Sequence, residues 1–132
     1  MSAFVDTNVL VRHLTGDPSE MAEAATEYLR TETELLLTDV VAAEAVYVLE
    51  SFYEAPRDQV AQALRSLVGF NSVICVDSAL LLRAIEVYET ARIDFVEAYL
   101  VACAESTGIA RVASFDRSLD RMVTVERIQP GR

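Results

Sequence analysis

The 132-residue chain has no lysine, no tryptophan, one histidine and two cysteines. All eleven basic residues are arginine, which excludes enzymes that need a lysine to bind phosphate or to form a Schiff base. His13, Cys75 and Cys103 show no CxxC or HxxxH spacing, which excludes a zinc site built from nitrogen and sulfur ligands. Because both cysteines fall inside apolar runs, we expect buried, unpaired thiols in a reducing compartment.

Long hydrophobic runs are also missing. The longest apolar stretches reach about ten residues, too few to span a bilayer, and Glu44, Arg83 or Glu97 interrupts each of them. Asp6 interrupts the first apolar run, so the pattern of a signal peptide is not present. Proline, glycine and serine form no linker, and the length is typical of one domain over residues 1–132. We therefore expect a single soluble, cytoplasmic domain that does not associate with membranes.

Acidic residues outnumber basic ones, and the excess is uneven. The formal net charge of −10 divides into −9 over residues 1–60, −3 over residues 61–110 and +2 over residues 111–132. Net charge therefore does not favour a nucleic-acid partner. Binding to RNA or DNA would require a local basic edge or bridging metal ions.

Short β-type runs alternate with amphipathic segments. Strands are expected at 2–6, 34–38, 72–76, 111–115 and, with a weaker pattern, 123–127. Helices are expected near 18–32, 38–54, 56–69, 78–89 and 94–106. Pro18 and Pro56 suit first helical turns, and Gly108 suits a C-cap. Short strands separated by helices indicate a parallel sheet between two layers of helices, a three-layer α/β domain.

Five carboxylates occur where these elements begin or end. Asp6 closes the first strand, Asp116 follows the fourth, and Glu44 comes about one and a half helical turns after the second. Asp94 and Glu97 open the last long helix. Ligands of open parallel sheets lie beyond the carboxyl ends of the strands, so these acids are expected to converge on one edge.

Each of these acids also has a purely structural explanation. Asp6 could form an Asx-turn or a helix N-cap, and Asp94 and Asp116 could each cap a helix. Glu44 could pair with an arginine across a helix interface. Their apolar neighbours nevertheless favour a bound cation, because burial without a partner raises the pKa of a carboxyl group and a cation reverses that effect. One shared site would explain all of them together.

The spacing of Asp94 and Glu97 supports a metal ion. Residues three apart lie on the same helix face, where like charges repel unless a cation lies between them. A site built from oxygen ligands suits Mg²⁺ or Mn²⁺, and such ions promote phosphodiester hydrolysis. A hydrolase with a covalent aspartyl intermediate at Asp6 is a weaker alternative, because the chain has no lysine.

The segments "FVDTNVLVR" at the start and "DFVEAYLVACAESTGIARVASFD" near the end resemble PIN domains, and among them the VapC-type toxin ribonucleases. The resemblance covers nearly the whole chain. It implies an α/β/α PIN-like domain with a central, mainly parallel sheet of four to five strands. It also implies a Mg²⁺- or Mn²⁺-dependent endoribonuclease held inactive by a VapB-type antitoxin.

The resemblance assigns four acidic positions, in chain order Asp6, Glu44, Glu97 and Asp116. Thr7 or Asn8 would shape the site beside the first acid. The family most often has aspartate at the third position, whereas this chain has Glu97 with Asp94 one turn earlier. Either of these two residues could therefore be the direct ligand, beside metal ligands at the first and fourth positions.

Partners are expected as well. Arg12 and Arg117 could contact RNA phosphates, as could Arg111 and Arg121. The chain is expected to form a homodimer, and "YVLESFYE" (47–54) is a candidate antitoxin-binding stretch that could equally be ordinary helix-pair core. Two alternatives stay open: a PIN nuclease that processes RNA without an antitoxin, and a non-catalytic domain that binds a metal or a partner.

Overall fold

The computed structural model describes residues 1–131. In chain order the elements are β1 (Ser2–Phe4), α1 (Thr7–Thr15), α2 (Ser19–Thr31), β2 (Glu34–Leu37), α3 (Asp39–Ser51), α4 (Arg57–Val68), β3 (Val73–Cys75), α5 (Ser78–Ala91), α6 (Phe95–Thr107), β4 (Arg111–Ala113), the 3₁₀ helix η1 (Arg117–Arg121) and β5 (Glu126–Ile128). They form two compact units, the first comprising Met1–Ser78 and the second beginning at Ala79.

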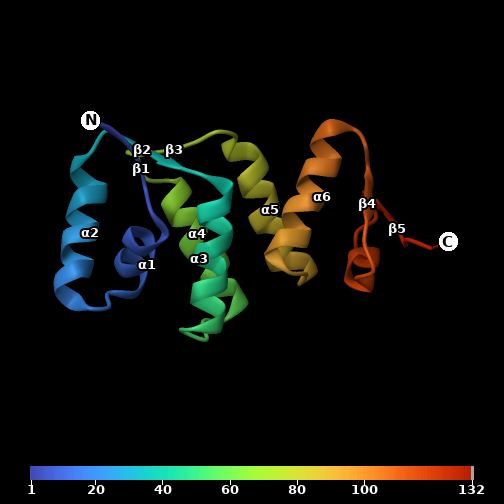
Figure 1. Cartoon of the computed structure of the whole chain (residues 1–132), viewed down its shortest axis with the longest axis horizontal. Helices are drawn as coiled ribbons and strands as arrows, with labels where there is room; N and C mark the ends of the chain where they lie inside the picture. Colours follow the sequence, from blue (N-terminus) through green and yellow to red (C-terminus); the bar gives the residue numbers. More distant parts are fainter. Residues whose placement is uncertain (132) are drawn as a thin grey trace. The chain divides into compact units, whose positions relative to one another are not determined.

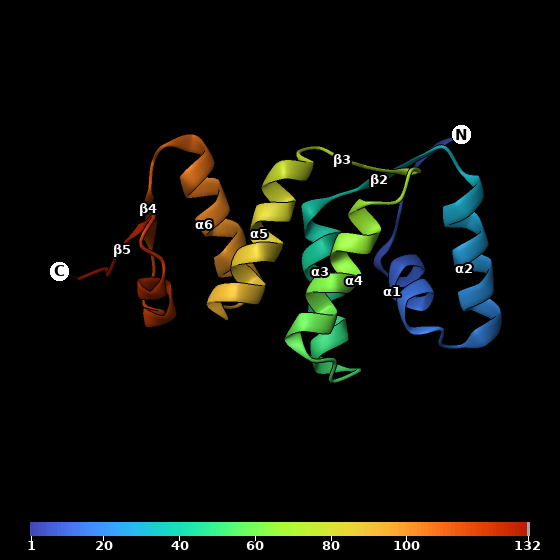
Figure 2. The ribbon, with the colours of Figure 1, turned by 180° about the vertical axis from the view of Figure 1, so that it is seen from behind.

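The first unit is built on a parallel sheet with the strand order β1-β2-β3. Figures 1 and 2 show α1 to α4 on the same side of these strands. Successive side chains of a strand point to opposite faces. Leu35, which pairs with Ala3 and Val73, is fully buried, whereas Phe4 in the next register row is 75% exposed. The side chains on one face of the sheet, among them Leu35, are therefore part of the core that the helices cover.

Helix ends in the first unit follow local sequence signals. The hydroxyl of Thr38 accepts a hydrogen bond from Val41 N–H at 3.2 Å and caps α3. Gly16 ends α1 with a φ of 72°, the left-handed conformation that glycine adopts without strain. Leu10 of α1 and Leu64 of α4 are completely buried in the core.

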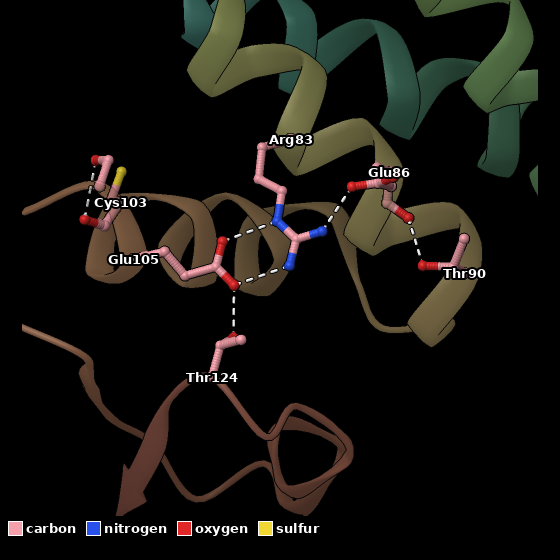
Figure 3. A network of polar contacts seen from close by, with 7 residues as sticks. Arg83, Glu86, Thr90, Cys103, Glu105 and Thr124 are labelled. Atoms are coloured by element: carbon pink, nitrogen blue, oxygen red, sulfur yellow. Dashed lines mark hydrogen bonds and ion pairs between the residues drawn. The ribbon is translucent and has the colours of Figure 1, made fainter. Parts of the chain in front are cut away.

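The second unit contains α5, α6 and a parallel pair of strands, β4 and β5, with η1 between them. Arg83 of α5 donates hydrogen bonds from Nε and Nη2 to the two carboxylate oxygens of Glu105 on α6, at 2.8 and 2.9 Å. Thr124, in the segment before β5, donates to the same carboxylate at 2.5 Å (Figure 3). This network joins three segments of the unit.

The predicted α/β class and the parallel strand pairing are confirmed. The five described strands divide into sheets of three and two, rather than one sheet of four to five. β5 lies at Glu126–Ile128 instead of 123–127, because pairing with β4 begins at Glu126 and Val123 remains exposed. The sequence interpretation missed α1, although Leu10 and Leu14 lie four apart ahead of Gly16.

The structure also bears on two smaller expectations, one about the cysteines and one about membrane spans. Cys75 and Cys103 are free thiols, but they are half-buried rather than fully buried. Burial, together with the nearby Asp39 carboxylate, raises the pKa of the Cys75 thiol. Among residues 1–131, no helix combines the length and the hydropathy that a membrane span requires.

Candidate metal centre

Two acids, Asp94 and Glu97, lie at the start of α6, next to buried residues that hold the chain in place. Ile93 and Phe95 are buried on either side of Asp94, while the Asp94 side chain is exposed. Asp94 occupies the N-cap position of α6, but its carboxylate makes no capping hydrogen bond. Glu97, in the first turn of the same helix, is partly buried. The capping explanation for Asp94 therefore fails, and its carboxylate is available for another role.

Asp116 follows β4 and caps η1. Its Oδ1 accepts a hydrogen bond from Ser118 N–H at 2.9 Å. The hydrogen bonds from Ser118 lower the pKa of Asp116, and the positive charges of Arg121 and Arg127 lower it further. Asp116 is therefore ionised at neutral pH and could offer a metal ion a negatively charged oxygen. Its carboxylate also caps η1, so the capping explanation holds in addition to any role as a ligand.

Asp94, Glu97 and Asp116 come together in the second unit. Each contributes one carboxylate oxygen, and the three oxygens all lie within 4.8 Å of one another. We call this cluster the acidic trio. Oxygens around a single octahedral Mg²⁺ are about 3 to 4 Å apart, so small side-chain movements would bring the acidic trio into that geometry. An all-carboxylate donor set suits Mg²⁺ or Mn²⁺, and the residues therefore fit such an ion.

Asp6 and Glu44 lie in the first unit. Asp6 is the N-cap residue of α1, but its side chain makes no capping hydrogen bond, and it is exposed rather than buried within its apolar run. Thr7 is buried and donates its hydroxyl hydrogen to Oε1 of Glu44 on α3. Asn8 is exposed next to them. The sequence left open that Glu44 pairs with an arginine, but its partner in the structure is the hydroxyl of Thr7.

A family model for the PIN domain matches residues 3–124. The chain belongs to the PIN domain family. PIN domains are generally metal-dependent nucleases, so membership supports a nuclease and a divalent metal as its cofactor. Comparison with curated proteins found no match. The prediction that the five acids of this PIN domain act in one reaction stays a prediction.

The predicted phosphate-binding arginines of this PIN domain have different surroundings. Arg12 lines a largely apolar hollow of about 550 Å³ that also includes Asp6 and Asn8. Arg117 is exposed and lines a separate hollow of about 500 Å³ together with Arg127. Arg111 is exposed at the start of β4.

Arg121 and Arg127 are engaged within the second unit. Arg121 donates to two main-chain carbonyls, and Arg127 forms a double hydrogen bond with Asp120 at 2.9 and 3.3 Å. The sequence interpretation treated Arg121 as a candidate phosphate contact and passed over Arg127. Arg127 lies seven residues after Asp120 and outside the segment "FDRSLDR", so local spacing gave no signal for this pair.

Proposed function

We propose that this PIN domain is a Mg²⁺- or Mn²⁺-dependent endoribonuclease that acts in the cytoplasm as the toxin of a VapBC-type toxin–antitoxin module. The observation that carries the nuclease proposal is the acidic trio, whose three oxygens lie within 4.8 Å of one another. Membership of the PIN family supports the same chemistry. The toxin role is supported by the resemblance of the first and last acidic motifs to VapC-type ribonucleases.

The proposed chemistry assigns each acid a task. A bound divalent ion would lower the pKa of a water molecule and neutralise charge that develops on the scissile phosphate. Asp94 and Glu97 would hold that ion from one turn of α6, and Asp116 from the residue before η1. Asp6 and Glu44 are proposed to act in the same reaction, with Thr7 holding the Glu44 carboxylate in one orientation.

We propose that RNA phosphates are bound by Arg12 and Arg117. Arg12 lines the same hollow as Asp6, and Arg117 directly follows Asp116 in the chain. Guanidinium groups bind phosphate oxygens through paired hydrogen bonds, so two such contacts would orient a strand without reading its sequence.

The proposed protein partners are a VapB-type antitoxin and a second copy of the chain. Within residues 47–54, Tyr47 is 67% exposed and Phe52 is 76% exposed. Exposed aromatic side chains of this size are typical of interaction sites, which supports this stretch as antitoxin-binding. Leu49 in the same stretch is buried and belongs to the core.

The test is cleavage of total cellular RNA by purified protein freed of any copurified antitoxin. We expect discrete fragments with Mg²⁺ or Mn²⁺, none with EDTA, and a loss of activity in Asp6→Asn and Asp116→Asn. Glu20→Gln, an exposed substitution on α2, is the matched control and should cleave like the wild type.

Other outcomes would favour the alternatives. Folded protein that binds Mn²⁺ but cleaves no RNA would indicate a non-catalytic binding domain. Cleavage by a chain whose expression does not impair growth, and which no small partner protein inhibits, would indicate an RNA-processing nuclease that acts without an antitoxin.

A further inference from the structure

Arg121 ends the short helix that Asp116 begins. Its Nη1 donates a hydrogen bond to the carbonyl of Arg92 at 2.7 Å and another to the carbonyl of Ala91 at 3.2 Å. Ala91 is the last residue of α5, and Arg92 begins the short turn that leads through Ile93 to Asp94 and α6. One side chain therefore connects η1, which carries Asp116, to the turn that leads into the other two acids.

The turn that Arg121 contacts needs such support. Arg92 has a φ of 56°, a left-handed conformation that residues other than glycine rarely adopt. Such conformations persist where the surrounding structure holds them in place. Ile93, buried at 2% exposure, anchors the following position, and Arg121 holds the carbonyls that precede it.

The η1 end of this connection is also fixed. Leu119 in the middle of η1 is completely buried, and Asp120 is held by Arg127. A movement of η1 would carry Asp116 with it, because Asp116 caps the same helix. Arg121 thus connects η1, whose N-cap residue is Asp116, to the turn that leads into Asp94 and Glu97.

We propose that Arg121 is a positioning residue for the acidic trio: it holds the turn before Asp94 against η1, so that the three carboxylates are together before an ion binds. This inference rests on the proposed metal-dependent function. Groups that orient metal ligands typically change metal affinity by 10- to 100-fold when they are removed. Because Arg121 acts through two main-chain carbonyls, we expect the lower end of that range.

The sign of the effect separates positioning from simple electrostatics. A guanidinium near the site repels a divalent cation, so a purely electrostatic Arg121 would, on removal, make Mn²⁺ bind more tightly. Loss of positioning has the opposite effect. We therefore expect Arg121→Met to weaken Mn²⁺ binding roughly tenfold. Arg121→Lys keeps both the charge and a donor, and should recover most of the affinity.

The experiment is Mn²⁺ titration of the full-length chain, freed of copurified protein and followed by electron paramagnetic resonance of free Mn²⁺. Arg111→Met, which removes an exposed arginine of the same unit, is the charge-matched control and should not weaken binding. Thermal unfolding in EDTA establishes that each variant is folded at the titration temperature. If Arg121→Met is unfolded there, Arg121→Gln takes its place, with the expected order of affinity wild type, Lys, Gln.

The outcomes distinguish the inference from the proposed function. Wild-type protein that does not bind Mn²⁺ would overturn the metal centre, and the positioning role with it. Wild-type binding that is lost in Asp116→Asn but unchanged or tightened in Arg121→Met would overturn the positioning role alone. Weaker binding that Arg121→Lys restores, with Arg111→Met unchanged, supports it.

Discussion

Thr7 on α1 and Glu44 on α3 are joined by a hydrogen bond from the buried hydroxyl to the carboxylate. Thr7 directly follows Asp6, so the contact ties the segment after β1 to the middle of α3. In the first unit, Thr7 therefore links the two acids that the resemblance assigns to the site, because it follows Asp6 in the chain and donates to Glu44.

Replacing Thr7 with valine keeps the shape of the side chain and removes its donor. We expect the free energy of unfolding to fall by about 1 kcal/mol, the usual worth of such a hydrogen bond. RNA cleavage should fall by roughly 10- to 100-fold as Glu44 loses its orientation. Urea unfolding and initial cleavage rates measure the two effects. Thr7→Ser retains the hydroxyl and should behave like the wild type; a loss in Thr7→Ser with none in Thr7→Val would show that the methyl group, not the hydrogen bond, matters.

Neutralising one acid of the trio should affect stability in opposite directions with and without metal. In EDTA, Asp94→Asn should raise the free energy of unfolding by about 0.2 to 0.5 kcal/mol, because the repulsion between like charges three residues apart is relieved. With Mn²⁺ at a hundred times its Kd, the wild type should gain about 2.7 kcal/mol. Asp94→Asn should gain much less.

Thermal unfolding with and without Mn²⁺ gives both quantities, and Glu97→Gln measured in parallel identifies the stronger ligand. A wild type whose unfolding does not respond to Mn²⁺ would contradict the assignment of the acidic trio as a metal site.

The sequence predicted which helices and strands form more accurately than where each of them begins and ends. Alternating apolar and amphipathic runs located all five described strands, because parallel strands joined by helices impose that pattern. The bounds of β5 were wrong because pairing with β4, rather than the β-propensity of "VTV", sets where that strand begins. α1 was missed because "TNVLVR" directly continues an apolar strand and contains β-branched residues that weaken the helical signal.

For the candidate site, the sequence supplied the residue types but could not decide what each side chain does. Asp94 and Asp116 both occupy N-cap positions, yet only Asp116 uses its carboxylate to cap. That difference depends on side-chain rotamers, which sequence spacing does not encode. The hydrogen bonds of Thr7 and Arg121 could not be predicted either, because their partners lie 37 and 29 residues away in the chain.

The ion pair between Arg83 and Glu105 should make stability sensitive to acid. Hydrogen bonds from Arg83, and then from Thr124, lower the pKa of Glu105 below its ordinary value of 4.5, and the same pair raises the pKa of Arg83. A carboxylate with a lowered folded-state pKa stabilises the fold above its unfolded-state pKa, and this contribution is lost as the pH falls through the folded-state value. The loss should therefore occur below about pH 4.5.

Glu105→Gln removes this titration. We expect its free energy of unfolding at pH 7 to be about 1 kcal/mol lower than that of the wild type, a value typical of a partly exposed, bidentate ion pair. The difference should shrink between pH 4.5 and pH 3. Urea unfolding across this range measures it, with Glu86→Gln, an exposed partner of Arg83, as the matched control. A difference that does not change with pH would mean that Glu105 contributes through packing alone.

His13 should make the first unit sensitive to pH closer to neutrality. Its Nδ1 and the hydroxyl of Thr26 are hydrogen-bonded at 2.8 Å, its ring meets Phe70 edge-on, and burial lowers its pKa from 6.5. As the pH falls below 6.5 the unfolded chain binds this proton before the folded chain does, so the free energy of unfolding falls, by at most about 1.4 kcal/mol per pH unit, until the folded-state pKa is passed. His13→Gln cannot titrate and can still bond to Thr26. Urea unfolding from pH 7.5 to 5.5 should show a smaller slope in this variant, and equal slopes would mean that other groups produce the sensitivity.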